Sequence, residues 1–293
     1  MTDLGPHPFR DLTTLDSVGD GRWRAHIHAT WTIGPKVHGG CMLAVCAAAA
    51  RRALLAAEVA ETAGITDTAG SAGADMQPLA VSASFVAAPD PGDVDLITVI
   101  RKRGKQVSVV DVELVQGDRV AVRASVTLGR PDEGDDVFAA AQPVAELPAE
   151  PTPGSTVVTP EHPMGQIVHV SGGADLSIDE TSAHFLAGKQ GDPVVRMWAR
   201  PRPGDEADRD TAALFALMAG DISAPVAMNL GRFGWAPTVQ LTAYLRRVPQ
   251  PGWMRVMASS TVLGTTWFEE DHTVVDSTGA VVVQSRQLAM MPR

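Results

Sequence analysis

The sequence predicts an α+β fold made of two similar halves, each packing a helix on an antiparallel sheet. The segment VHGGCMLAVCAAAARRALLAAEVA (37–60) is an alanine- and leucine-rich run of the length and composition of a buried helix. Several strand-like runs separated by short turns follow it. The second half of the chain then repeats this order of elements, which is typical of an internal duplication.

The first half supplies these elements in order. GRWRAHIHATWTIG (21–34) is rich in aromatic and β-branched residues of alternating polarity, which favours a strand. Gly39 and Gly40 mark the start of the long helix. The strands expected after the helix are PLAVSASFVAA (78–88), DVDLITVIRKR (93–103), VSVVDVELVQ (107–116) and RVAVRASVTLG (119–129).

A change of composition separates the halves. Residues 131–165 are rich in Pro, Gly and acidic residues and show little periodicity, so we predict a connector between a domain at 1–130 and a domain at 166–293. The second half is expected to contain a helix that includes Asp221, begins after Asp208 or Asp210 and stops before Pro225. Its expected strands are 176–188, 193–202, 237–247, 253–264, 266–276 and 280–291.

Composition narrows the classes of function. The 293 residues are 45% hydrophobic and 20% charged, as in an ordinary globular protein, and the net charge of −10 argues against nucleic-acid binding. Cys41 and Cys46 are two small core residues in this interpretation, and with so few ligands no metal site is predicted. The N-terminus lacks the features of a secretory signal, and CMLAVCAAAA (41–50) is too short to span a bilayer, so we expect a cytoplasmic protein without membrane contact.

An overlay of the two halves shows where their chemistry differs. PLAVSASFVAAPDPG (78–92) matches PTVQLTAYLRRVPQPG (237–252), and later glycines keep the same intervals. Thr238 then lies opposite Leu79, Gln287 opposite Ser125, and Asp221 near Ala50 or Arg51. If the two halves pack face to face, there are two equivalent clefts, and only one of them would hold all three polar groups.

Asp221 is an acid at an unexpected position. In ALFALMAGDISAP (213–225) it continues the apolar helix face of Leu214, Leu217 and Met218, where an unpaired charge is costly. Hydrogen bonds from a threonine hydroxyl and a glutamine amide would make such a carboxylate tolerable, and it could then deprotonate a water. Backbone NH groups at Gly39 and Gly40 could polarise a carbonyl oxygen, although two glycines before a helix also simply permit a turn and close packing.

These residues resemble the acyl-CoA thioesterase II (TesB-like) family, whose members are tandem double hotdog proteins. The matching pieces in the first half are HGGCMLAVCAAAARRAL (38–54) and 101–128. In the second half they are AGDISAP (219–225), PTVQLTAYLRRVPQPGW (237–253) and DSTGAVVVQSRQLA (276–289). The resemblance implies a hydrolytic water oriented by Asp221, Thr238 and Gln287. Thr242, four residues along the strand, is a rival for Thr238, whereas Gln284 is placed on the opposite strand face.

The resemblance also implies the reaction. A thioester of CoA would be hydrolysed to a carboxylic acid and free CoA without metal or redox cofactor. His38, Arg103 and Trp235 are candidate substrate contacts, with the CoA phosphates taken by Arg101, Lys102, Arg103 and Lys105 or by Arg246 and Arg247. Two alternatives stay open, a non-catalytic acyl-CoA-binding protein and a hotdog enoyl-CoA hydratase or dehydratase. The latter pairs its acid with a nearby histidine, and none follows Asp221 until His272. A homo-oligomer is expected, because exposed sheet edges tend to be covered.

Overall fold

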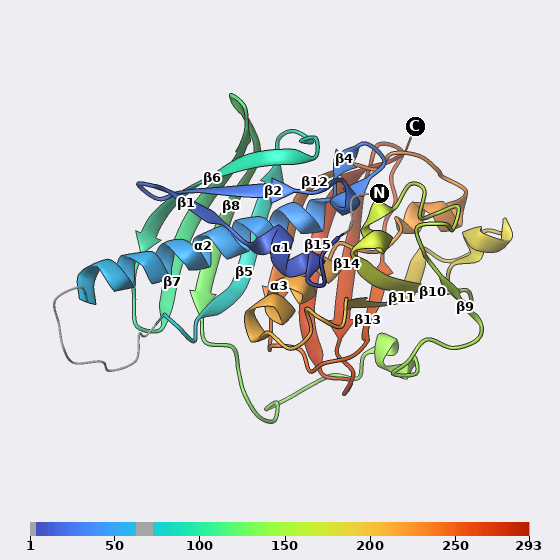
Figure 1. The fold of residues 1–293 in the computed structure, drawn as a ribbon. Coiled ribbons are helices and arrows are strands. Elements are labelled where there is room, and N and C mark those ends of the chain that lie inside the picture. The colour runs from blue at the N-terminus through green and yellow to red at the C-terminus, as the bar shows by residue number, and fades with distance from the viewer. Residues whose placement is uncertain (1–3, 63–72, 293) are drawn as a thin grey trace.

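The computed structural model describes residues 4–62 and 73–292 and contains one continuous antiparallel sheet that runs through both halves (Figure 1). The strand order in the described part is β1-β2-β6-β7-β8-β5-β12-β15-β14-β13-β11-β10-β9. The first-half strands are β1 (Asp16–Gly19), β2 (Arg22–Ile27), β5 (Gln77–Phe85), β6 (Gly92–Lys102), β7 (Val107–Gln116) and β8 (Arg119–Gly129). The second-half strands are β9 (Ser155–Val157), β10 (Ala174–Asp179), β11 (Val194–Pro201), β12 (Thr238–Leu245), β13 (Met254–Ser259), β14 (Trp267–Val275) and β15 (Val281–Met290).

Helix α2 (Gly39–Thr62) is the long helix of the first half, and it begins at the paired glycines as expected. Its residues from Cys41 to Ala50 are all buried, because the sheet, α1 (Pro8–Thr13) and α3 (Arg209–Ala219) together surround it. The apolar run at 41–50 is part of a longer helix, which over Gly39–Ala60 is long and apolar enough to meet the criteria for a membrane span. Most of that window is buried in the fold, however, and a core helix meets the same criteria of length and composition.

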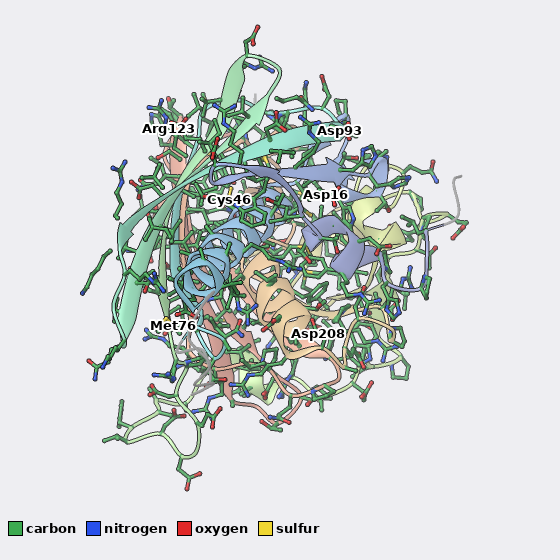
Figure 2. The ribbon with its side chains drawn as sticks, turned by 60° about the vertical axis from the view of Figure 1, so that its left-hand side comes forward. Asp16, Cys46, Met76, Asp93, Arg123 and Asp208 are labelled. Atoms are coloured by element: carbon green, nitrogen blue, oxygen red, sulfur yellow. The ribbon has the colours of Figure 1, made fainter. Side chains whose placement is uncertain are left out.

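Helix α3 is shorter and carries Asp221 just beyond its end. The Asp208 carboxylate accepts a hydrogen bond from the backbone NH of Thr211 and so caps the helix N-terminus (Figure 2). The helix ends at Ala219, and Gly220 forms the C-cap. Asp221 is therefore on the loop to the short 3-10 helix η5 (Val226–Leu230), not on the apolar face of a helix.

The two halves join through strands β5 and β12, which pair antiparallel with Thr242 opposite Ser82. Helices α2 and α3 lie next to each other on one face of the joined sheet, as both views show (Figures 1 and 2). This arrangement confirms the predicted α+β double hotdog. The start of α2 comes to the end of α3, so residues far apart in sequence meet at the junction of the halves.

Some expected boundaries differ from the structure. The strand expected at 176–188 ends at Asp179, and residues 184–187 form the 3-10 helix η4 (His184–Ala187). Within the connector, β9 pairs with β10, and the 3-10 helix η2 (Pro143–Glu146) buries Val144 against the second half. The remaining short elements are η1 (Ala29–Trp31), β3 (Thr32–Ile33), β4 (Lys36–Val37) and η3 (His169–Gly172). The division at residues 130 and 165 stays a prediction.

Candidate functional site

A cavity of about 600 Å³ lies where the two halves meet. Its walls come from the start of α2, the loop after α3, the stretch before β12, and strands β10, β14 and β15. Most of the lining is apolar: Ile33, Val37, Met42, Phe85, Val158, Met164, Ile167, Val168, Leu176, Ile178, Met197, Met228, Phe233, Trp235 and Phe268. The polar lining is His38, Asp221, Ser223, Thr238, Glu270 and Gln287. A mostly apolar cavity with a few polar groups that point into it is typical of a small-molecule binding site.

The Asp221 carboxylate lines this cavity with only 7% of its side chain exposed. Burial raises the pKa of Asp221 to about 7, and the hydrogen bond from the Gly40 backbone NH opposes part of that rise. A carboxylate with a pKa near 7 is ionised in a useful fraction at neutral pH and still accepts a proton readily. This is the balance that a general base needs.

Gly39 and Gly40 lie directly against Asp221. A Cβ atom on Gly39 would be 2.6 Å from Asp221 Oδ2, and one on Gly40 would be 2.6 Å from the Met218 carbonyl oxygen. The glycines are therefore required for the close approach of α2 to the end of α3, the packing role considered from the sequence. Gly39 also lines the cavity, whereas the NH of Gly40 is engaged by Asp221.

Thr238 and Gln287 form a hydrogen-bonded pair on the sheet side of the cavity. Thr238 Oγ1 donates to Gln287 Oε1 over 2.6 Å, and the Gln287 side chain is almost fully buried. Strand β12 has a bulge at Val239, between Thr238 and Gln240, that turns Thr238 to the inner face. The same bulge places Thr242 on the other face, where it points outward and its hydroxyl bonds Ser82 Oγ, so only Thr238 of the two threonines lines the cavity.

Glu270 and His272 are buried polar residues of the site that sequence reasoning missed. Glu270 lines the cavity, accepts a hydrogen bond from the Val226 backbone NH at 2.6 Å, and accepts another from Gln287 Nε2. His272 Nε2 lies 2.9 Å from the hydroxyl of Ser223. In TWFEEDHTVVD (266–276) both residues alternate with outward-facing ones, so strand periodicity placed them on the inner face with Phe268.

The ionisation of these two buried groups follows from burial. Burial raises the pKa of Glu270 to about 7, the bonds from Val226 and Gln287 lower it, and the charge of Asp221 raises it. Burial lowers the pKa of His272 to about 4, so its imidazole is neutral at pH 7. Asp221 and Glu270 are therefore the two groups of this wall that exchange protons near neutral pH.

His38 contacts Asp221 from the first half. Its Nε2 lies 2.9 Å from the Asp221 carbonyl oxygen and 3.7 Å from Oδ2, and its Nδ1 lies 3.6 Å from Cys41 Sγ. Burial lowers the pKa of His38 to about 4, so the ring is neutral. The neutral ring donates its Nε2 proton to the Asp221 carbonyl and so holds the loop against α2.

Of the other two predicted substrate contacts, one lines the cavity and the other does not. Trp235 lines the cavity and is half exposed, so it stands at the opening. Arg103 lies in the turn between β6 and β7 and is not part of the cavity wall. In the described residues, no three His, Cys, Asp or Glu side chains are grouped as metal ligands.

The equivalent position in the first half has different chemistry. Strand β5 has its own bulge at Leu79, which aligns Thr238 with Pro78, one residue from the sequence overlay. The paired strands likewise align Gln287 with Val126 and Glu270 with Val110. Where Asp221 meets the start of α2, the mirrored contact is an ion pair of 2.7 Å between Arg51 and Asp210 at the start of α3. The position equivalent to the polar site is thus occupied by apolar side chains and by an ion pair.

Sequence profiles match this chain over most of its length. The profile of the acyl-CoA thioesterase N-terminal domain matches residues 27–129, and that of the acyl-CoA thioesterase C-terminal domain matches residues 144–291. The chain belongs to the acyl-CoA thioesterase family. The two profiles fall on the two halves that β5 and β12 join, so the family's domain pair corresponds to the fold described above.

This acyl-CoA thioesterase family member is similar to further proteins in sequence or in fold. An uncharacterized protein of Mycobacterium tuberculosis is 46% identical over 286 residues, which cover 92% of this chain and 91% of that protein. A Thermobifida fusca crystal structure described as a thioesterase II has a TM-score of 0.79 at 24% identity and covers 99% of this chain and 100% of its own. A tesB protein of Mycobacterium avium subspecies paratuberculosis has a TM-score of 0.71 at 18% identity, with full coverage of both chains. At these identities the solved structures establish the shared hotdog fold.

Proposed function

We propose that this protein hydrolyses acyl-CoA thioesters, with Asp221 as general base and with Thr238 and Gln287 orienting the water. The observation that supports this most directly is the placement of all three side chains on one largely apolar cavity, with the glycine-led start of α2 directly against Asp221. Membership of the acyl-CoA thioesterase family supports the substrate class.

The hydrogen-bond directions suit a water nucleophile. Because Thr238 donates its only hydroxyl hydrogen to Gln287 Oε1, its oxygen lone pairs are left to accept a hydrogen bond from water. Asp221 takes a proton from that water as its oxygen bonds to the thioester carbonyl carbon. The carbon–sulfur bond then breaks, and the proton passes to the CoA thiolate. The products are a carboxylic acid and free CoA.

The developing oxyanion needs a donor on the α2 side. Since the Gly40 NH is bonded to Asp221, the backbone NH of Gly39 is the glycine donor that we assign to the carbonyl oxygen. A helix N-terminus adds a partial positive charge there. The acyl chain would occupy the methionine- and isoleucine-lined part of the cavity, with Trp235 at the opening.

The remaining predictions concern features beyond this site. Binding of the CoA phosphates by Arg103 and its neighbours stays a prediction, and Arg103 lies apart from the cavity wall. The cytoplasmic location, self-association, and independence from cofactors stay predictions as well.

A hydratase or dehydratase is the second candidate, because His38 Nε2 lies 3.7 Å from Asp221 Oδ2. The sequence argument against this function was the lack of a histidine close behind Asp221, and the fold supplies one from the other half. The engagement of both ring nitrogens favours thioester hydrolysis, since Nε2 faces the Asp221 carbonyl and Nδ1 faces Cys41. Conversion of an enoyl-CoA to a hydroxyacyl-CoA without thiol release would favour the hydratase.

The test is release of free thiol from acyl-CoAs of several chain lengths by the wild type and by Asp221→Asn. We expect the variant to lose about 10²–10⁴-fold in kcat with a small change in KM, because the base acts in the transition state. Asp271→Asn on the outer face of β14 is the matched control and should keep wild-type kinetics. Wild-type turnover in Asp221→Asn would disprove the assignment, and binding of acyl-CoA without turnover by the wild type would indicate a binding protein.

A further inference from the structure

We propose that Glu270 is a positioning residue that fixes the side-chain amide of Gln287, and through it the hydroxyl of Thr238, for the attack of water. This inference rests on the proposed thioester hydrolysis and adds to it a residue on a third strand. It assigns a role to the buried carboxylate of Glu270, which is not one of the three proposed water-activating residues Asp221, Thr238 and Gln287.

The contacts of Glu270 define one direction of hydrogen bonding. Its side chain projects inward from β14, and the residue is 1% exposed. Oε1 accepts from the Val226 NH at 2.6 Å, and Oε2 accepts from Gln287 Nε2. These two donors favour the ionised form of the carboxylate and so oppose part of the rise in pKa that burial causes. The order of donors and acceptors from β14 to β12 is then fixed.

That order decides the orientation of the Gln287 amide. With Nε2 bound by Glu270, Oε1 must face Thr238, and it accepts the Thr238 hydroxyl hydrogen at 2.6 Å. A glutamine amide has nearly the same shape after a 180° flip, so packing alone does not choose between the two orientations. In the flipped amide Nε2 would face Thr238, and the hydroxyl would have to turn its hydrogen toward the cavity. A water there would meet a donor instead of an acceptor.

Glu270 also secures the loop that carries Asp221. Val226 begins η5, five residues after Asp221, so the Val226–Glu270 hydrogen bond ties the end of this loop to β14. The Glu270 carboxylate therefore fixes both groups that would contact the water. It fixes Asp221 through the loop, and it fixes the Thr238 hydroxyl through Gln287.

The charged neighbours of Glu270 limit how it acts. Asp221 on the loop after α3 is close enough for their charges to interact, His38 stands at the start of α2, and His272 follows on β14. The two histidines are neutral at pH 7 because burial lowers the pKa of each to about 4. Repulsion between Glu270 and Asp221 is therefore the main charge interaction at Glu270, and it disfavours the simultaneous ionisation of the two carboxyl groups.

The first half provides an independent comparison. The position equivalent to Glu270 is Val110, which is fully buried among apolar side chains. An apolar residue is thus compatible with this place in the hotdog sheet, and a buried carboxylate there is costly. The carboxylate is present in the half whose loop carries Asp221, together with Gln287 and Thr238, which replace Val126 and Pro78.

The test is Glu270→Gln, an isosteric change with one acceptor and one donor in place of two acceptors. We expect kcat to fall at least about tenfold while KM changes less than about threefold, because the water loses its orientation and the acyl site keeps its shape. The acid limb of the pH profile should move to lower pH, because Asp221 then ionises without a neighbouring negative charge. The control is Glu269→Gln, which removes the same charge from the adjacent residue, whose carboxylate binds the Thr261 and Val262 amides outside the cavity.

A measurement that does not depend on turnover completes the design. With ¹⁵N-labelled glutamine, the Gln287 side-chain NH₂ should show one proton shifted downfield by the carboxylate, and Glu270→Gln and Glu270→Met should both lose this shift. Melting temperatures verify that each variant is folded. Wild-type kcat and an unchanged acid limb in folded Glu270→Gln would overturn the proposal while thioester hydrolysis stands. Absence of thiol release from the wild type would instead overturn the proposed function and with it the catalytic part of the role of Glu270. The NMR signal alone would then decide whether Glu270 fixes the orientation of the Gln287 amide.

Discussion

At the scale of single residues, the site depends on acids that are buried at a cost to stability. Asp221 is nearly enclosed, and its pKa of about 7 lies above its ordinary value of 3.8. The folded protein therefore binds this proton more tightly than the unfolded chain does. Stability is lost as the pH rises from about 4 through 7, because the folded state must then hold a buried charge.

This linkage predicts that Asp221→Asn is more stable than the wild type at a pH of about 8. About three pKa units correspond to a gain of up to about 4 kcal/mol, since each unit is worth about 1.4 kcal/mol. The gain should shrink as the pH falls toward about 4, where both states of the wild type bind the proton. Urea unfolding of both proteins at several pH values measures it. A variant that is less stable at every pH would show that the charge is well compensated.

The threonine assignment gives a second prediction at this scale. Thr238→Val removes the hydroxyl that bonds Gln287 and should lower kcat by about 10- to 100-fold, whereas Thr242→Val on the outer face should stay within about twofold of wild type. Thiol-release kinetics of the two variants, measured side by side, test which threonine contributes to the site. Equal losses would mean that the bulge does not set which threonine serves the site.

At the scale of elements, sequence patterns identified the long helix, most strands and the repeat, because these depend on local periodicity. The contacts that make the site are not local. The bulge at Val239 inverts the alternation on which the Thr242 alternative relied, and His38 meets Asp221 across 183 positions of sequence. Strand alternation places Glu270 on the inner face with Phe268, but the contacts that mark it as part of the site come from Val226 and Gln287 on other elements.

The approach of α2 to the end of α3 predicts the effect of Gly40→Ala. Its Cβ would lie 2.6 Å from the Met218 carbonyl oxygen and 3.2 Å from Asp221 Cβ, so the helices must separate. Overpacking of this kind costs about 1–3 kcal/mol, and moving Asp221 should also reduce kcat. Chemical denaturation and thiol release measure the two effects. Gly154→Ala, whose Cβ would have its nearest neighbour at 4.0 Å, should leave both unchanged.

At the scale of the whole molecule, the described residues of this pseudo-symmetric fold place the polar groups of the candidate site at one of the two equivalent positions and not at its counterpart. The position that mirrors the Asp221 contact holds the Arg51–Asp210 ion pair, and Gln77 Nε2 also donates to Asp210 at 2.7 Å. The strands there bring Val110 and Val126 in place of Glu270 and Gln287. Both the charge pairing and the apolar side chains argue against a second water-activating centre.

We therefore expect one bound molecule of a non-hydrolysable acyl-CoA ketone analogue per chain. Isothermal titration calorimetry gives this stoichiometry directly, and Asp221→Asn should retain it because the acyl cavity is unchanged. Two equal sites per chain would show that the first half also binds substrate despite its ion pair.

The pairing of β5 with β12 inside one chain has a consequence for how such a molecule can change. In a dimer of identical chains, a substitution made once is installed twice, so a pair of enclosed acids becomes four. In the fused chain, the buried acids Asp221 and Glu270 destabilise only one half. Aliphatic side chains in the other half continue to stabilise the shared sheet. Covalent linkage of the repeats thus separates the residues that perform chemistry from those that keep the protein folded.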